Sequence, residues 1–188
     1  MNSNLIITIG REYGTGGREI GQKLALRLGV PFYDRELITR AAKKTGFDEK
    51  LFEQLDKRAT NSFLYSLTMF GSVGLNGMSL TDQLYLAQSN IIREMAEDSS
   101  CVIVGRCADH VLRDFPNKFD FFIHGSIEDR VKRVQTCGDY VIEGKTPEAA
   151  LEKMDKQRST YYNYYTGKVC GKCDHYDLCI NAGRLGVE

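Results

Sequence analysis

The chain has 188 residues, which is enough for one well-buried domain. Its 25 basic residues balance its 25 acidic residues, and this balance argues against a nucleic-acid polymer as a partner bound by bulk electrostatics. No apolar run approaches the roughly 18 residues that span a bilayer, and the N-terminus lacks a basic segment followed by an apolar export core. We therefore expect a cytoplasmic protein without a membrane partner.

Five short apolar segments alternate with helical patterns along the chain. Continuous apolar character over a few residues is typical of strands buried on both faces of a sheet. The expected strands are residues 4–10, 30–34, 101–106, 119–125 and 176–182. The expected helices are residues 17–28, 34–58 as two helices broken near Gly46, 80–97, 107–113, 126–136 and 147–165. This alternation predicts right-handed parallel crossovers, and so an α/β fold of three layers with a central parallel sheet of about five strands.

The segment 60–79 is apolar, contains three glycines and has no clear period. A loop with a short helix that covers the core is one interpretation. A subunit interface, through which the chain would form a homo-oligomer, and a mobile flap over a substrate are the alternatives.

A glycine-rich turn joins the first expected strand to the first expected helix, with glycines at 10, 14, 16, 17 and 21. Glycine tolerates positive φ and leaves space, so consecutive backbone N–H groups can surround an anion at the positive end of the helix dipole. So many glycines exceed what a simple turn requires. The turn therefore predicts a phosphate-binding loop.

One template for such a loop is the dinucleotide motif G-x-G-x-x-G. Gly14 and Gly16 match its first two glycines, but Glu19 stands where the third belongs. Asp34, at the end of the second expected strand, occupies the place of a ribose-binding acid. This template would indicate an oxidoreductase.

The other template is the P-loop motif G-x-x-x-x-G-K-[ST], which the chain also fails to match literally. Arg11 occupies the position of the first glycine, Gly17 occupies the position of the lysine, and Arg18 follows at once. The loop alone leaves the two templates open, so the choice depends on the rest of the chain.

Three longer motifs in the chain resemble segments of a known protein family. They are "ITIGREYGTGGREIGQKLALRLGVPFYDRELI", "VGRCADHVLRDFP" and "YYNYYTGK" followed by "YDLCINAGRLG". Together they resemble the cytidylate-kinase-like family, within the P-loop nucleoside monophosphate kinases, over nearly the whole chain. The resemblance implies a single P-loop kinase-like domain over residues 1–188, with the P-loop NTPase fold and a helical lid at about 130–168. It also implies phosphoryl transfer from ATP, with Mg²⁺, to a small-molecule nucleotide, a CMP-like or dCMP-like monophosphate being the first expected acceptor.

Laid against the family's loop "ITIDGPSGAGKGT", the chain keeps two glycines and lacks the lysine that neutralises the transferred phosphoryl group. Arg18 is the nearest substitute and Arg11 is the alternative. The loop residues implied to hold the donor phosphates are Tyr13, Gly14, Thr15, Gly16, Gly17 and Arg18. Thr15 lies inside the loop and not at its helical end, so we expect the nucleotide phosphates and water to hold Mg²⁺, and no protein metal site is assigned.

The acceptor side matches the family better. "YDRELITR" places Asp34 and Arg40 where the family has "LDTGAMYR", and "VGRCADH" places Arg106 in a segment that resembles "DGRD". The resemblance implies that Asp34 lies near the sugar or base and that the two arginines bind the acceptor phosphate. A helix N-cap at Asp34 and solvated arginines are the alternatives. Asp109 is the nearest acid that could replace the family's missing aspartate.

The lid segment supplies two further arginines. Arg133 follows the fourth strand in "SIEDRVKRV", and Arg158 lies three residues after Asp155 in the next helical pattern. The resemblance implies that both arginines close over the phosphates and act in catalysis. A solvated helix face is the alternative.

The six cysteines indicate reduced thiols in a cytosolic enzyme. "CGKCDHYDLC" invites a zinc interpretation through Cys170, Cys173, His175 and Cys179, but no second C-x-x-C follows and Cys179 belongs to an expected strand.

Two functional alternatives to a kinase stay open. The first is a non-catalytic nucleotide-binding or regulatory module that kept the fold and lost the lysine. The second is the oxidoreductase, which gives no role to Arg40, Arg106 or the lid-like helix.

Overall fold

The computed structural model of the chain describes residues 4–34, 40, 79–137, 140 and 146–188. Apart from Asp34 and Arg40, the expected helices over 34–58 lie outside the described residues, and so does the segment 60–79 apart from Ser79.

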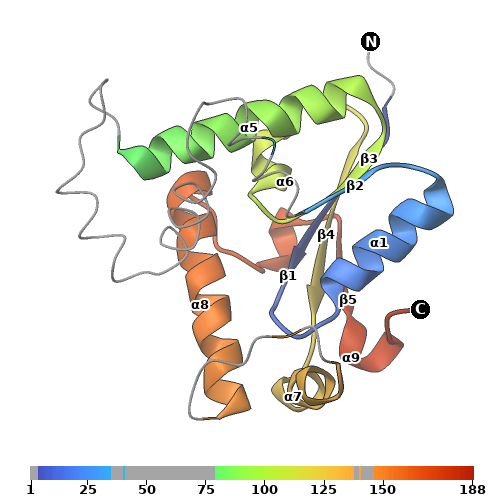
Figure 1. Cartoon of the computed structure of the whole chain (residues 1–188), viewed down its shortest axis with the longest axis vertical. Coiled ribbons are helices and arrows are strands. Elements are labelled where there is room, and N and C mark those ends of the chain that lie inside the picture. The colour runs from blue at the N-terminus through green and yellow to red at the C-terminus, as the bar shows by residue number, and fades with distance from the viewer. Residues whose placement is uncertain (1–3, 35–39, 41–78, 138–139, 141–145) are drawn as a thin grey trace.

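A sheet of five parallel strands forms the centre of the molecule (Figure 1). The strands are β1 (Ile6–Arg11), β2 (Phe32–Tyr33), β3 (Cys101–Val104), β4 (Lys118–His124) and β5 (Leu178–Asn181), in the order β2-β3-β1-β4-β5. In the central register, Ile6 lies opposite Cys101 on one side and Lys118 on the other. The α/β fold and the parallel sheet expected from the sequence are therefore confirmed, with β2 shorter than the expected 30–34.

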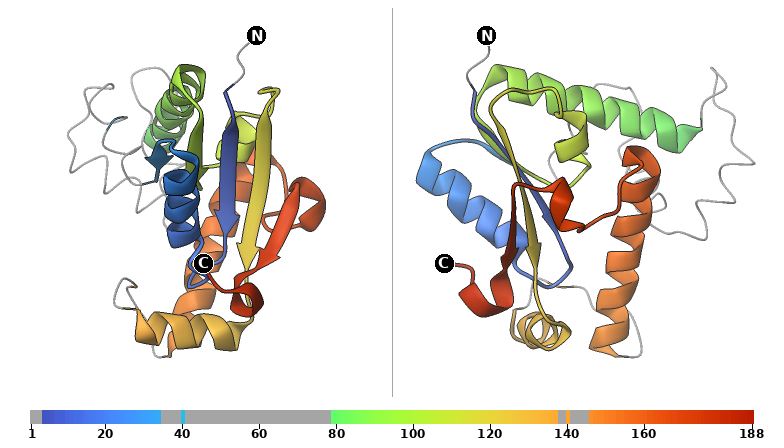
Figure 2. Two further views of the ribbon diagram at one scale, coloured as in Figure 1. Left: turned by 90° about the vertical axis from the view of Figure 1, so that its right-hand side faces the viewer. Right: turned by 180° about the vertical axis from the view of Figure 1, so that it is seen from behind.

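Helices cover both faces of this sheet (Figure 2). They are α1 (Gly17–Leu28), α5 (Leu80–Asp98), α6 (Ala108–Val111), α7 (Ile127–Thr136), α8 (Pro147–Thr166) and α9 (Ala182–Leu185), with a short 3-10 helix η1 (Cys173–His175). The helix expected over 107–113 is shorter, because Cys107 adopts a left-handed conformation and α6 begins only after it. Within the described residues, no helix is long and apolar enough to cross a membrane.

The strand side chains alternate between two cores, as the period of a pleated strand requires. Ile7 and Ile9 of β1 pack with Leu24 of α1 on one face. Ile6 of β1 packs with Ile92 of α5 on the other face. Because both faces of β1 are buried, its carboxyl end is held rigidly, and the glycine-rich loop leaves from this end.

Side-chain caps fix the beginnings of the helices near that edge. The side chain of Ser126 accepts a hydrogen bond from the Asp129 amide at the start of α7. Thr146 caps α8 in the same way, with Pro147 in the first turn. In contrast, α1 begins after Gly16, whose φ is 79° and which has no capping side chain. Figure 2 shows α7 beyond the carboxyl ends of the strands, close to the start of α1.

Candidate active site

The glycine-rich loop joins Arg11, the last residue of β1, to Gly17, the first residue of α1. Gly14 and Gly16 have φ of 82° and 79°, a region that residues with a side chain rarely adopt. Thr15 stabilises the turn from within, because its Oγ1 donates to the Glu12 carbonyl at 2.9 Å and accepts from the Gly17 amide at 3.4 Å. The loop therefore brings its backbone to the positive end of the α1 dipole, where an anion is stabilised.

A clamp from α7 and α8 holds the outer side of this loop. The Tyr13 amide donates to Asp155 Oδ1 at 2.6 Å, and Arg130 donates both to the Tyr13 carbonyl at 3.2 Å and to the second oxygen of Asp155. The Tyr13 amide, expected at the donor phosphates, is thus engaged by a carboxylate of α8. Arg130 is not among the site residues predicted from the sequence. The signal was its position four residues before Val134, which places a charge on the buried face of α7.

Arg133 of α7 lies against the loop. A Cβ on Gly16 would lie 2.8 Å from its guanidinium carbon, so the missing side chain makes room for Arg133. The guanidinium pairs with Glu19 of α1, and its Nε donates to the Tyr140 hydroxyl at 3.3 Å. Arg133 therefore joins α7 to the first turn of α1.

Arg18 points away from the loop toward the end of β2. Its side chain is 57% exposed, and its Nε donates to Asp34 Oδ2 at 2.8 Å. The guanidinium also lies 5.8 Å from the centre of the Phe32 ring. Arg18 therefore forms an ion pair with Asp34, which the resemblance assigns to the acceptor side.

Arg11 passes beneath the first turn of α1, and its guanidinium also lies near Asp34. A Cβ on Gly17 would lie 2.8 Å from Arg11 Cβ, and a Cβ on Gly105 would overlap Arg11 Nη1. The guanidinium therefore lies between the glycine-rich loop and the turn after β3. Burial, and next the positive charge of Arg158, lower the pKa of Arg11 to about 9.

The turn after β3 has an unusual backbone. Gly105, Arg106 and Cys107 all have positive φ, of 80°, 58° and 55°. This conformation costs a residue with a side chain roughly 1–2 kcal/mol, and such strain concentrates at functional sites. The Gly105 amide donates to the Ile9 carbonyl at 3.0 Å, so the turn starts from the β1–β3 ladder. Arg106 lies close enough to Arg11 for its charge to lower the Arg11 pKa.

Arg40 and Asp34 have different neighbours, although the resemblance implies that both lie on the acceptor side. The Arg40 guanidinium lies 5.5 Å from the centre of the Tyr33 ring. Asp34 pairs with Arg18 and, at 3.9 Å, with Arg11. Among the acceptor residues, Asp34 and Arg106 therefore lie beside Arg11, and Arg40 lies on Tyr33.

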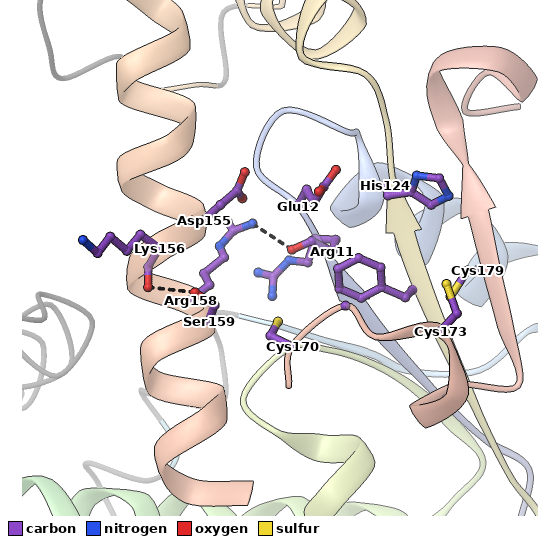
Figure 3. Close-up of a pocket in the computed structure, with 12 residues that line it drawn as sticks. Arg11, Glu12, His124, Asp155, Lys156, Arg158, Ser159, Cys170, Cys173 and Cys179 are labelled. Atoms are coloured by element: carbon purple, nitrogen blue, oxygen red, sulfur yellow. Dashed lines mark hydrogen bonds between the residues drawn. The ribbon is translucent and has the colours of Figure 1, made fainter. Parts of the chain in front are cut away.

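A cavity of about 370 Å³ opens between α8 and the carboxyl ends of β1 and β4 (Figure 3). Arg11 and Arg158 point toward one another inside it from β1 and α8. Arg158 Nη1 donates to the Arg11 carbonyl at 3.4 Å, and its guanidinium lies 5.0 Å from the centre of the Tyr13 ring. Burial lowers the pKa of Arg158. The cavity therefore presents two partly desolvated cations, which suits an anionic ligand.

The cysteines on the far wall of the cavity are free thiols. Burial raises the pKa of Cys170 to about 11, so this thiol is neutral at physiological pH. Burial, and next the neighbouring Cys173, raise the pKa of Cys179 to about 11. In the part of the chain that the structure describes, no three His, Cys, Asp or Glu side chains gather as a metal site would require.

Asp109 is bound by a tyrosine of α8. The Tyr162 hydroxyl donates to Asp109 Oδ2 at 2.6 Å, and burial raises the pKa of this carboxyl group. The acids closest to the loop, Glu12, Asp34 and Asp155, each pair with an arginine. Their carboxylates are thus engaged in ion pairs.

The strand order agrees with the comparison with known proteins. Residues 6–184 match the model of the cytidylate kinase-like family. The chain belongs to this family. No curated protein gave a significant match.

Solved structures share the fold of this chain. An uncharacterized protein from Eubacterium ventriosum ATCC 27560 is 35% identical, with a TM-score of 0.68 over 95% of this chain and 89% of that chain. Shikimate kinase from Bacteroides thetaiotaomicron is 15% identical, with a TM-score of 0.54 over 95% of this chain and 87% of that one. The second likeness shows the shared fold, a parallel sheet in the order 2-3-1-4-5 that is found in P-loop kinases.

Proposed function

We propose that this family member transfers the γ-phosphoryl group of ATP to a nucleoside monophosphate, with CMP or dCMP as the first acceptors to test. One observation carries the proposal: the glycine-rich loop and a group of arginines meet at the carboxyl edge of β1 and β3. In α/β sheets this edge is where ligands bind. Phosphoryl transfer needs mostly positioning and charge neutralisation, which a loop at a helix N-terminus with nearby guanidinium groups supplies.

The roles follow from the positions of the residues. The loop from Gly14 to Arg18 would hold the donor phosphates at the start of α1, and Mg²⁺, when bound, would neutralise part of their charge. Arg106 and Arg40 would bind the acceptor phosphate, and Asp34 would lie beside them. Arg133 and Arg158 would enclose the phosphates, with residues 130–168 acting as the lid of a single domain.

The reaction needs no general base. An oxygen of the acceptor phosphate is already anionic, and it forms a bond to the γ-phosphorus of ATP. The bond between this phosphorus and the β–γ bridging oxygen breaks, and the electron pair leaves with ADP. The products are ADP and a nucleoside diphosphate, and arginines around the transferred group stabilise its charge.

The test is an ADP-release screen of ATP and Mg²⁺ against all ribo- and deoxynucleoside monophosphates, with calorimetric titration of ATP alongside. We expect turnover with a pyrimidine monophosphate, and Arg106→Ala should raise the KM for that acceptor at least tenfold. Arg27→Ala, an exposed arginine in the last turn of α1, is the matched control. Turnover that does not depend on any monophosphate would contradict the proposal.

The rival is a nucleotide-binding module without catalysis, and the glycine at position 17 favours it, because the usual lysine is missing there. This rival predicts ATP binding in the calorimeter with no ADP release on any acceptor.

A further inference from the structure

We propose that Arg11 is the catalytic cation of the loop and takes the place of the missing lysine, reaching the donor phosphates from the end of β1. The inference rests on the proposed function, since it names the residue that neutralises charge during the same transfer. The sequence alone points first to Arg18, which directly follows the lysine position. Three features of the structure favour Arg11.

The first feature is steric. A Cβ on Gly17 would lie 2.8 Å from Arg11 Cβ and 3.1 Å from Arg11 Cγ. Real Cβ atoms essentially never approach another heavy atom this closely, so a side chain at 17 and the arginine at 11 exclude one another. The P-loop motif has glycine at the first of these positions and lysine at the second, whereas this chain has arginine and glycine. The long cationic side chain has been exchanged between two positions that share one space.

The second feature is where the side chain ends. Arg11 Nη1 lies so close to Gly105 that a Cβ there would overlap it. Gly105 is the first residue after β3, and Arg106 follows in a strained conformation. The guanidinium of Arg11 therefore lies between the loop that would hold the donor and the turn that would hold the acceptor. The transferred group must pass through this place.

The third feature is the state of its charge. Among the described residues, the carboxylate closest to Arg11 is Asp34, at 3.9 Å, and Asp34 already accepts a hydrogen bond from Arg18 at 2.8 Å. Arg158 and Arg106 lie nearby and, together with burial, depress the Arg11 pKa to about 9, which still leaves a cation at neutral pH. A desolvated cation among like charges is unfavourable unless an anion joins it. A polyphosphate supplies that anion.

Arg18 and Arg133 differ on this last point. Arg18 is 57% exposed and has a carboxylate partner within hydrogen-bond distance. Arg133 pairs with Glu19. Among these three described arginines, only Arg11 lacks a carboxylate within hydrogen-bond distance, so its charge remains to be used by a ligand.

The experiment returns the cationic side chain from position 11 to position 17, where the P-loop motif has it. Four variants of the full chain are compared with wild type: Arg11→Ala, Arg18→Ala, Gly17→Lys, and the double variant Arg11→Gly with Gly17→Lys. ADP release with the best acceptor, calorimetric binding of ATP, calorimetric binding of inorganic tripolyphosphate and thermal unfolding are measured for each. Arg27→Ala is again the matched surface control.

We expect Arg11→Ala to lower kcat by about 100-fold to 1000-fold, the range seen when one preorganised charge-stabilising donor is lost. Arg18→Ala should cost at least tenfold less. The double variant should regain at least tenfold over Arg11→Ala, because a lysine at 17 then has the space that Arg11 filled. Recovery by a charge that enters from another backbone position is not expected from a purely structural arginine.

Unfolding gives a readout that does not depend on activity. Gly17→Lys alone should lower the unfolding temperature by several degrees, and the same change in the Arg11→Gly background should lower it much less. Equal losses in both backgrounds would overturn the steric argument. A loss with Arg18→Ala that exceeds the loss with Arg11→Ala would overturn the catalytic assignment.

The two proposals fail in different ways. If no monophosphate supports ADP release by the wild type, the kinase assignment falls. In that case, weaker tripolyphosphate binding by Arg11→Ala and its recovery in the double variant still support the location of the anion site. If tripolyphosphate binds equally well to wild type and Arg11→Ala, the assignment of Arg11 falls whatever the activity screen shows.

Discussion

Two turns leave the same edge of the sheet, from β1 and from β3, and they reach positive φ by different means. The turn after β1 uses glycine at both such positions, Gly14 and Gly16, and α7 and α8 clamp it from outside. The turn after β3 uses glycine once and then places Arg106 and Cys107 in the same region. The first turn is relaxed and held by its neighbours, whereas the second stores strain in its own backbone. Such strain persists only where the surroundings enforce it, which in this fold is beside Arg11.

The largest effect should come from Gly105→Ala in the second turn. The new Cβ would overlap Arg11 Nη1 and would also occupy a residue with φ of 80°. We expect a loss of about 3 kcal/mol in the free energy of unfolding, since backbone strain and displacement of the partly buried Arg11 guanidinium act together. Urea unfolding measures the loss.

Gly29→Ala is the matched control for this substitution. Gly29 has φ of 66°, but a Cβ there would meet nothing within 4 Å. Only the strain of a positive φ should therefore destabilise Gly29→Ala, by about 1 kcal/mol. Equal losses for the two variants would show that the space beside Gly105 is not filled by Arg11.

The clamp on the first turn gives the next largest effect. Asp155→Ala removes the acceptor of the Tyr13 amide and leaves the buried Arg130 without its closest carboxylate. Breaking a buried pair on one side costs about 3–5 kcal/mol, and the partial exposure of Asp155 reduces this to about 2–3 kcal/mol.

The exposed pair between Lys172 and Asp174 provides the comparison for Asp155→Ala. Asp174→Ala should leave the free energy of unfolding essentially unchanged, because solvent screens this pair. A loss for Asp155→Ala as small as this would mean that the first turn holds its shape without α8.

The contrast between the two turns also shows what the sequence could predict. The first turn could be predicted because so many glycines close together are typical of a backbone that binds an anion. The strands could be predicted because both their faces are apolar. The left-handed conformation of Arg106 could not be predicted from the sequence, since only tertiary contacts enforce it. The exchange between positions 11 and 17 shows in the sequence as two departures from a motif. Their shared space became visible only when the Arg11 side chain was seen beneath α1.

Arg106→Gly should separate stability from binding in the second turn. Glycine adopts φ of 58° without strain, so we expect the free energy of unfolding to rise by up to about 1 kcal/mol. Affinity for the acceptor monophosphate should fall at the same time, because the guanidinium is lost. Parallel urea unfolding and calorimetric titration test this. A loss of stability would indicate that contacts of the arginine, and not the needs of a ligand, keep it in this conformation.

The smallest effect should be a pH dependence just after the second turn, where α6 carries His110. Its Nδ1 is buried and, in the described structure, has no hydrogen-bond partner. Burial is the main cause that lowers the pKa of this histidine, with Arg113, Lys168 and Arg93 acting in the same direction and Asp109 opposing them. The unfolded chain therefore binds a proton more readily than the folded chain once the pH falls below about 6.5.

Stability should consequently decrease as the pH falls from about 6.5 toward the lower folded-state pKa of His110. The decrease should be less than about 1 kcal/mol, because solvent reaches part of the ring. Urea unfolding of wild type and His110→Gln at pH 7.5 and pH 5.5 isolates the contribution, since both proteins keep His124 and His175. If the two proteins lose the same stability on acidification, His110 does not titrate differently in the folded state. The helix after the strained turn would then be less tightly buried than its contacts imply.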